Sequence, residues 1–190
     1  MTGIVILAAG SSSRLGQPKQ NLMYEGETLL QRAVNAAMAS LCDVVIVVLG
    51  ANEEAITPTI ENKKVTIIKN PDWQEGMASS IRAGINRLKQ NEQNFDSVIL
   101  MLCDQPFVDA GLLDQLIQNK QAKGIVACAY NETIGPPVLF DRKYFDEMLL
   151  LKGQEGAKKL ILKYPDDVET VPFPLGAVDI DTMEDYERLE

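Results

Sequence analysis

The chain has 190 residues, 46% of them hydrophobic and 24% charged, a composition that favours a globular protein with one continuous core and excludes intrinsic disorder. The formal net charge of -9 excludes long nucleic acid as a partner, because binding to its phosphate backbone requires a basic face. The absence of histidine excludes Ser-His-Asp and Cys-His catalysis, histidine acid–base chemistry and His-ligated zinc.

The first two thirds of the chain alternate between strand and helix patterns. Residues 3–9 form a short apolar run rich in β-branched residues, which is typical of a strand buried on both faces. Apolar residues recur at helical spacing over residues 27–40, and residues 43–49 repeat the buried-strand pattern. The pattern continues with a helix at 52–60, a strand at 65–68, a helix at 77–89, a strand at 97–103, a helix at 109–120 and a strand at 124–129. This alternation predicts an α/β fold with a mostly parallel sheet covered by helices on both faces.

After residue 130 the alternation weakens. We expect a short extended piece at 138–140, helices at 142–151 and 156–162, a strand at 168–171 and a closing helix at 183–189. No linker, repeat or low-complexity tract divides the chain, so we expect a single domain over residues 1–190.

The segment after the first strand, residues 8–19, is the first candidate for chemistry. Its small residues let backbone N–H groups approach an anion, and Arg14 and Lys19 bring positive charge. It is not a Walker loop, because Gly16 is not followed by Lys and Ser or Thr, and the dinucleotide fingerprint fails because three serines follow Gly10. The alternative is an ordinary turn with solvated charges.

Two acidic segments are expected near that loop. Asp104 follows the most apolar strand, where a carboxylate is a natural Mg²⁺ ligand, although it could instead cap a helix. Asp179 and Asp181 point to one side if their segment is extended, so they could supply a second carboxylate. An equally good alternative is a cap for the last helix, with Asp181 or Thr182 at the N-cap position.

A third polar segment, residues 73–82, runs through Gly76 into a helix. The N–H groups and hydroxyls of its first turn, including Ser79 and Ser80, could hold a ribose, a base or a phosphate. The alternative is that both serines are ordinary first-turn residues.

Taken together, motifs in this order resemble the MobA-like nucleotidyltransferase family, most closely its molybdenum cofactor cytidylyltransferase branch. They are Leu7-Ala8-Ala9-Gly10 with Arg14, Gly16 and Lys19; Gly76-Met77-Ala78-Ser79-Ser80-Ile81; Cys103-Asp104-Gln105-Pro106; Pro137-Val138-Leu139-Phe140; and Asp179-Ile180-Asp181-Thr182. The resemblance extends over nearly the whole chain.

The resemblance implies a Rossmann-like domain of the nucleotide-diphospho-sugar transferase type. In such a domain the first loop wraps a triphosphate, with Arg14 and Lys19 as the catalytic cations. The implied metal is Mg²⁺, held by Asp104 and Asp181. The implied nucleotide-binding residues are Leu7, Ala8, Ala9, Gly10, Arg14, Lys19, Gly76, Ser79, Ser80 and Asp104.

The same resemblance implies transfer of CMP from CTP to a phosphorylated acceptor, with release of pyrophosphate. Ala8-Ala9-Gly10 favours CTP, since the family associates Ala-Gly-Gly with guanosine. The implied acceptor is of the molybdopterin type, and a molybdoenzyme or maturation factor is an implied partner. The segment 153–158, Gly-Gln-Glu-Gly-Ala-Lys, departs from the Gly-Asp-x-Gly-Ala-Arg expected near the acceptor.

Two alternatives stay open at this point. One is a guanylyl- or sugar-phosphate nucleotidyltransferase of the same fold. The other is a non-catalytic carrier of a nucleotide or cofactor, against which the retained cations and paired carboxylates argue.

Cysteine usage and hydropathy indicate the compartment. Cys42, Cys103 and Cys128 are an odd number, lack CxxC spacing and lie in or beside apolar runs, so we expect free thiols in a reducing environment. We find no run of 18 apolar residues and no signal-peptide pattern at the start. We therefore expect a cytoplasmic protein without a membrane partner.

Overall fold

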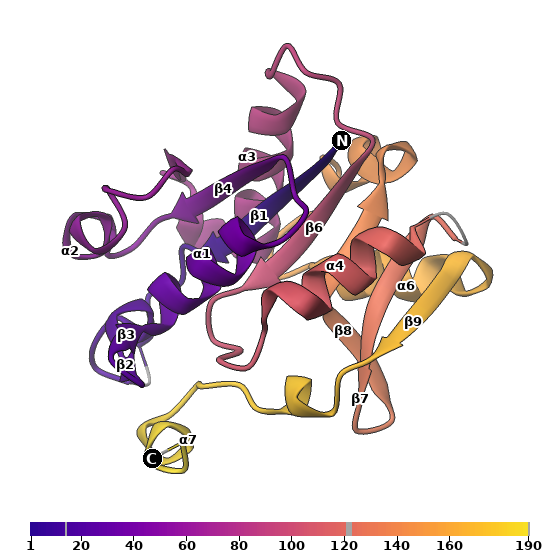
Figure 1. Ribbon diagram of the computed structural model, residues 1–190. Coiled ribbons are helices and arrows are strands. Elements are labelled where there is room, and N and C mark those ends of the chain that lie inside the picture. The colour runs from indigo at the N-terminus through magenta and orange to yellow at the C-terminus, as the bar shows by residue number, and fades with distance from the viewer. Residues whose placement is uncertain (14, 121–122, 190) are drawn as a thin grey trace.

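The computed structural model describes residues 1–13, 15–120 and 123–189. A seven-stranded sheet with the order β5-β4-β1-β6-β8-β7-β9 runs through the molecule (Figure 1). Its strands are β1 (Thr2–Ala8), β4 (Val44–Leu49), β5 (Thr66–Lys69), β6 (Ser97–Leu102), β7 (Ile125–Tyr130), β8 (Thr133–Asp141) and β9 (Val168–Pro172). The α-helices are α1 (Leu29–Ala39), α2 (Glu53–Ile56), α3 (Met77–Lys89), α4 (Ala110–Asn119), α5 (Phe145–Met148), α6 (Ala157–Lys163) and α7 (Met183–Glu187).

The predicted α/β architecture is confirmed. Strands β5, β4, β1 and β6 are all parallel, β9 is parallel to β7, and β8 is antiparallel to both β6 and β7. Within the described ranges the chain forms one α/β domain around this sheet.

The core lies in two layers, one on each face of the sheet. On one face α1 and α4 pack Leu30, Val34 and Leu113 against β1 and its neighbours. On the other face α3, α5 and α6 form the second layer. Helix α3 lies directly on β1, because a Cβ at Gly84 would come within 2.5 Å of the Val5 side chain. This packing places the N-terminus of α3 beside the carboxyl end of β1.

Strand β8 is the main departure from the sequence prediction. It covers Thr133–Asp141, whereas only residues 138–140 were expected to be extended. Prolines 136 and 137 suppress a strand prediction because they have no N–H for a ladder. The structure accommodates them at an irregularity in the register, where Ala127 pairs with Val138 but Cys128 pairs with Gly135.

Several helix boundaries also differ. The helix expected at 27–40 begins at Leu29, because Thr28 forms a capping box with Gln31 and Glu27–Thr28 forms strand β3. The helices expected at 52–60 and 142–151 each divide into an α-helix and a 3-10 helix, η2 (Thr57–Thr59) and η4 (Arg142–Tyr144). The hairpin of β2 (Met23–Tyr24) with β3 was not expected, since two-residue strands leave no periodicity.

The C-terminal segment returns to the first loop. Ile180 is fully buried in a small cluster with Leu15, Leu22 and Leu29, and the Tyr186 hydroxyl donates to the Met23 carbonyl at 2.6 Å. Helix α7 therefore lies beside the β2–β3 hairpin (Figure 1). In the described part of the chain, no helix is long and apolar enough to cross a membrane.

Candidate active site

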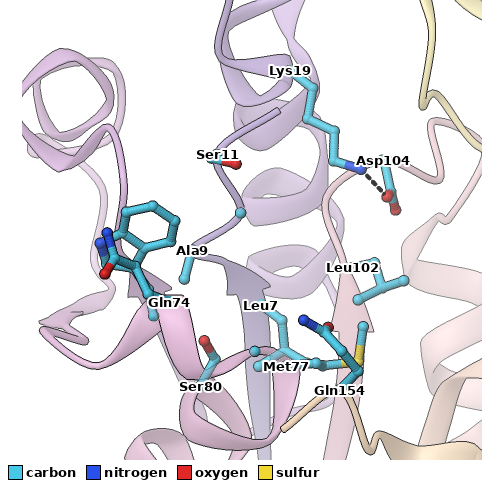
Figure 2. A pocket seen from close by; sticks show the side chains of 13 residues that line it. Leu7, Ala9, Ser11, Lys19, Gln74, Met77, Ser80, Leu102, Asp104 and Gln154 are labelled. Carbon is cyan, nitrogen blue, oxygen red and sulfur yellow. Dashed lines mark hydrogen bonds and ion pairs between the residues drawn. The ribbon is translucent and has the colours of Figure 1, made fainter. Parts of the chain in front are cut away.

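A cavity of about 300 Å³ opens at the carboxyl ends of β1 and β6 (Figure 2). Ligands of open parallel sheets bind at this edge because loops and helix N-termini converge there. The lining residues are Leu7, Ala9, Gly10, Ser11 and Lys19 from β1 and its loop, Trp73, Gln74, Gly76, Met77 and Ser80 around the start of α3, Leu102 and Asp104 from β6, and Gln154.

Lys19 joins the two acidic segments at the mouth of this cavity. Its Nζ lies 2.5 Å from Asp104 Oδ2 and 3.0 Å from Asp181 Oδ1, and Figure 2 shows its side chain directed at Asp104. Burial opposes the positive charge, but the Asp104 carboxylate outweighs it, so the pKa of Lys19 is raised. The structure therefore brings together one cation and two carboxylates from three distant segments, and the cation stays protonated at physiological pH.

The first loop is held in shape by a residue that the sequence analysis missed. Gln20, in the 3-10 helix η1 (Lys19–Asn21), is fully buried, and its Nε2 donates to the carbonyls of Ala8 at 2.8 Å and Gly10 at 3.1 Å. The backbone N–H of Lys19 donates to Ser12 Oγ at 2.9 Å. The only sequence signal for this role of Gln20 was its position directly after Lys19, the candidate phosphate-binding lysine. Arg14 lies outside the described residues.

Asp104 does not cap a helix. That position belongs to Asp109, whose Oδ1 accepts from Leu112 N at the start of α4 at 2.8 Å. The Asp104 carboxylate instead uses Oδ2 for Lys19, while its Oδ1 is buried and has no hydrogen-bond partner among the described residues. A buried carboxylate oxygen without a donor is costly unless a ligand satisfies it.

The second acidic segment caps the last helix and also brings a carboxylate to Lys19. Thr182 caps α7 and forms a capping box with Asp185, which leaves the Asp181 carboxylate to pair with Lys19. Buried Ile180 anchors the segment, and its N–H donates to the Asp104 carbonyl at 3.1 Å. Burial raises the pKa of Asp179, and the nearby Asp104 and Asp181 carboxylates raise it further.

The start of α3 forms the opposite wall. Gly76 has φ of +120°, and a Cβ there would lie 2.4 Å from the Gly153 carbonyl oxygen, so the two loops meet at a position that only glycine fits. Ser80 lines the cavity, whereas Ser79 and Ala8 are buried behind its wall. Trp73, Gln74, Met77 and Gln154 also line it. Their segments, 73–82 and 153–158, were singled out in the sequence, but these four side chains were not named as binding residues.

The donor set fits a divalent cation. Mg²⁺ takes one or two carboxylates and completes its shell with water and substrate phosphates. Asp104 and Asp181 supply two, and the buried Oδ1 of Asp104 is an oxygen in need of a ligand. Among the described residues, no group of three or more Cys, Asp or Glu side chains is arranged to hold a metal by itself. A metal here would therefore share its shell with the substrate.

The neighbouring thiol takes no part in this chemistry. Cys103 immediately precedes Asp104 and is buried, and burial together with the Asp104 carboxylate raises the pKa of its thiol to about 12. It stays protonated and packs in the core below the site.

Comparison with known proteins agrees with this geometry. The family model described as the MobA-like NTP transferase domain matches residues 4–168. The chain is 29% identical to nicotine blue oxidoreductase of Paenarthrobacter nicotinovorans, over 97% of this chain and 94% of that protein. It is 27% identical to molybdenum cofactor cytidylyltransferase of Escherichia coli, over 96% of this chain and 92% of that protein.

Solved structures show the same fold. The crystal structure of Rv0371c from Mycobacterium tuberculosis superposes with a TM-score of 0.87 at 32% identity, covering 99% of this chain and 96% of that one. A complex of Rv0371c with manganese gives a TM-score of 0.82 at 29% identity, covering 99% and 97%.

Proposed function

The chain belongs to the MobA-like NTP transferase family and is a nucleotidyltransferase, and we propose that it transfers CMP from CTP to a phosphorylated acceptor of the molybdopterin type. One observation carries the proposal: Lys19 Nζ lies within 3.0 Å of carboxylates on two other segments, at the mouth of a cavity lined by Ala9 and Gly10. Cys42, Cys103 and Cys128 are free thiols, which supports a reducing cytoplasmic location.

The chemistry suits a protein without histidine. An acceptor phosphate oxygen attacks the α-phosphorus of CTP, a new phosphorus–oxygen bond forms, and the bond to the β-phosphate breaks with pyrophosphate as the leaving group. Because the attacking oxygen is already anionic, the protein needs no strong base. Alignment of the reactants can supply about 7–11 kcal/mol of the barrier. The remaining task is to stabilise charge on the phosphates.

The residues at the cavity mouth divide this task. The ammonium of Lys19 forms ion pairs with Asp104 and Asp181. In the complex we expect its Nζ to face the phosphates, which bring negative charge of their own. Asp104 and Asp181 would hold Mg²⁺, which neutralises phosphate charge when bound. Arg14 is proposed as the second cation.

The choice of CTP and of the acceptor rests on likeness. Ala9 and Gly10 line the cavity, and the Ala8-Ala9-Gly10 motif favours cytidine in the family. The relative from Escherichia coli is named for cytidylyl transfer to the molybdenum cofactor and matches along nearly its full length.

The test is a release assay with purified protein. Pyrophosphate is measured with CTP, GTP, ATP or UTP, in the presence of molybdopterin-type or sugar-phosphate acceptors, with Mg²⁺ or Mn²⁺. We expect the highest rate with CTP and a molybdopterin-type acceptor. A preference for GTP or for a sugar phosphate would replace the proposed substrates within the same reaction class, and nucleotide binding without pyrophosphate release would indicate a carrier.

Because one relative is named as an oxidoreductase, the assay also tests NADH and NADPH as substrates. The first loop lacks the glycine fingerprint of dinucleotide enzymes, because three serines follow Gly10. We therefore expect no oxidation of NADH or NADPH by the protein. Nicotinamide turnover without nucleotidyl transfer would overturn the proposed function.

A further inference from the structure

A buried amide lies directly behind the wall of the cavity. Asn70 follows β5, is 3% exposed, and continues the β4–β5 ladder through its N–H, which donates to the Leu49 carbonyl at 2.8 Å. It does not line the cavity and none of the functions above uses it. Its side chain nevertheless makes three hydrogen bonds, all to groups near the start of α3.

The orientation of this amide is determined by its neighbours. The backbone N–H of Asp72 can only donate, and it lies 3.0 Å from Asn70 Oδ1. The Nδ2 group therefore faces α3, where it donates to Ser79 Oγ at 2.8 Å and to Ser80 Oγ at 3.0 Å. Both protons of the amide are used, so neither serine can donate back to it.

The two serines differ in whether their hydroxyl protons are already used in a hydrogen bond. Ser79 donates its hydroxyl proton to the Gly76 carbonyl at 2.8 Å, so its hydrogen bonding is complete inside the wall. The Ser80 hydroxyl, by contrast, donates no hydrogen bond to any of the described residues. Ser80 lines the cavity, and Figure 2 shows its hydroxyl oxygen directed into the open space.

We propose that Asn70 is a positioning residue that makes Ser80 a hydrogen-bond donor toward the ligand. The complementary group on the ligand is a hydrogen-bond acceptor, namely a carbonyl oxygen, an unprotonated ring nitrogen or a ribose oxygen of the nucleotide. This inference rests on the proposed function in that the ligand is a nucleoside triphosphate.

The direct test reverses the polarity of the amide. Asn70→Asp keeps the shape and the bond from Asp72 N, but it removes both Nδ2 protons, so the Ser80 hydroxyl turns to donate to the new carboxylate. We expect the dissociation constant for CTP to rise by about 10-fold or more, and Ser80→Ala should raise it by a similar factor. Trp73 lines the cavity and is the single tryptophan of the chain, so its fluorescence reports binding.

Ser79 supplies the matched control. It bonds to the same amide and is as buried as Ser80, yet it does not line the cavity. Ser79→Ala should therefore change the dissociation constant less than twofold. The double variant Asn70→Asp with Ser80→Ala should bind CTP no more weakly than Ser80→Ala alone, because Asn70 acts through Ser80. Additive losses, or an equal loss in Ser79→Ala, would make Asn70 a purely structural residue and overturn the proposal.

Two precautions keep the result decisive. If Asn70→Asp does not fold, Asn70→Ala removes the donor without adding charge, and the same non-additivity with Ser80→Ala is expected. Binding does not depend on turnover, so a wild-type protein that binds CTP without releasing pyrophosphate would end the proposed transfer and leave the role of Asn70 standing. Normal CTP binding by the Asn70 variants would overturn that role alone, and a wild-type protein that binds no nucleotide would overturn both.

Discussion

The two halves of the sheet differ in strand direction and in how their strands are connected. Strands β5, β4, β1 and β6 are parallel and alternate with helices, and the cavity opens at the carboxyl ends of β1 and β6. Strands β8, β7 and β9 mix directions, and β8 carries two prolines at a register irregularity. The first half holds Lys19 and Asp104, while the second half leads the chain back so that Asp181 can reach them. The regular half of the sheet thus positions Lys19 and Asp104, whereas the irregular C-terminal part of the chain brings Asp181 to them.

The largest effect should come from the regular half. Lys19→Ala removes the cation at the cavity mouth, and we expect turnover to fall by several orders of magnitude, on the order of 10³-fold, because charge on the phosphates loses its stabilising partner. Asp104→Ala should act similarly. The measurement is the rate of pyrophosphate release, with circular dichroism to verify the fold. Lys89→Ala is the control, since Lys89 pairs with Asp146 at the far end of α3. Near-normal turnover would remove the altered residue from the mechanism.

The next effect compares the carboxylates from the two halves. Asp104→Asn and Asp181→Asn should each raise the Mg²⁺ concentration for half-maximal rate, by about 10- to 100-fold. Asp104→Asn should have the larger effect, because its side chain is 11% exposed against 49% for Asp181. Chelation of the metal should abolish turnover in the wild type.

Asp109→Asn controls for a lost charge close to the site. Asp109 caps α4 by accepting from Leu112 N and does not line the cavity, so the metal requirement should not change. An unchanged metal requirement in both Asp104→Asn and Asp181→Asn would contradict the metal assignment.

A smaller effect is expected where the two halves are joined. Gln105 follows Asp104, and its Nε2 donates to the carbonyls of Pro136 and Gly176, each at 3.1 Å. Gln105→Met leaves both carbonyls without this donor, so the free energy of unfolding should fall by about 2 kcal/mol. Because Gly176 precedes the segment of Asp181, turnover should also fall, by less than in Lys19→Ala. Urea unfolding and the release assay measure both, and Gln118→Met on the exposed face of α4 should change neither.

The same division explains what the sequence predicts. The strands and helices of the first half follow from apolar periodicity, and α3 was expected with its observed ends, Met77 and Lys89. Lys19 and Asp104 were chosen because polar residues after parallel strands meet at one edge, whereas Asp181 was implied by the family resemblance. The roles of Gln20 and Asn70 were not predicted, because the sequence does not show the buried hydrogen bonds that each makes in the folded chain. The length of β8 was missed because proline argues against strands in general.

The smallest effect concerns the far edge of the irregular half and depends on pH. Lys143, and then the Tyr144 hydroxyl, lower the pKa of Asp167 to about 2 by hydrogen bonding to its carboxylate. A carboxylate whose pKa is lower in the folded state stabilises the protein above its unfolded pKa of about 4, and this contribution disappears as the pH falls toward 2. Asp167→Asn should therefore be less stable than the wild type at pH 7, and the difference should shrink between pH 4 and pH 2.

Asp166, the residue before Asp167, provides the control for this prediction. Asp166 is exposed, and its backbone carbonyl, not its carboxylate, accepts from Lys123. Asp166→Asn should therefore lower the free energy of unfolding at pH 7 by less than Asp167→Asn does. Because Asp167 also accepts from the Gly124 N–H at 3.1 Å, it holds the start of β7, so the loss should appear in urea unfolding and leave CTP binding unchanged. A pH-independent loss in Asp167→Asn would mean that its packing, and not its charge, holds this edge of the sheet.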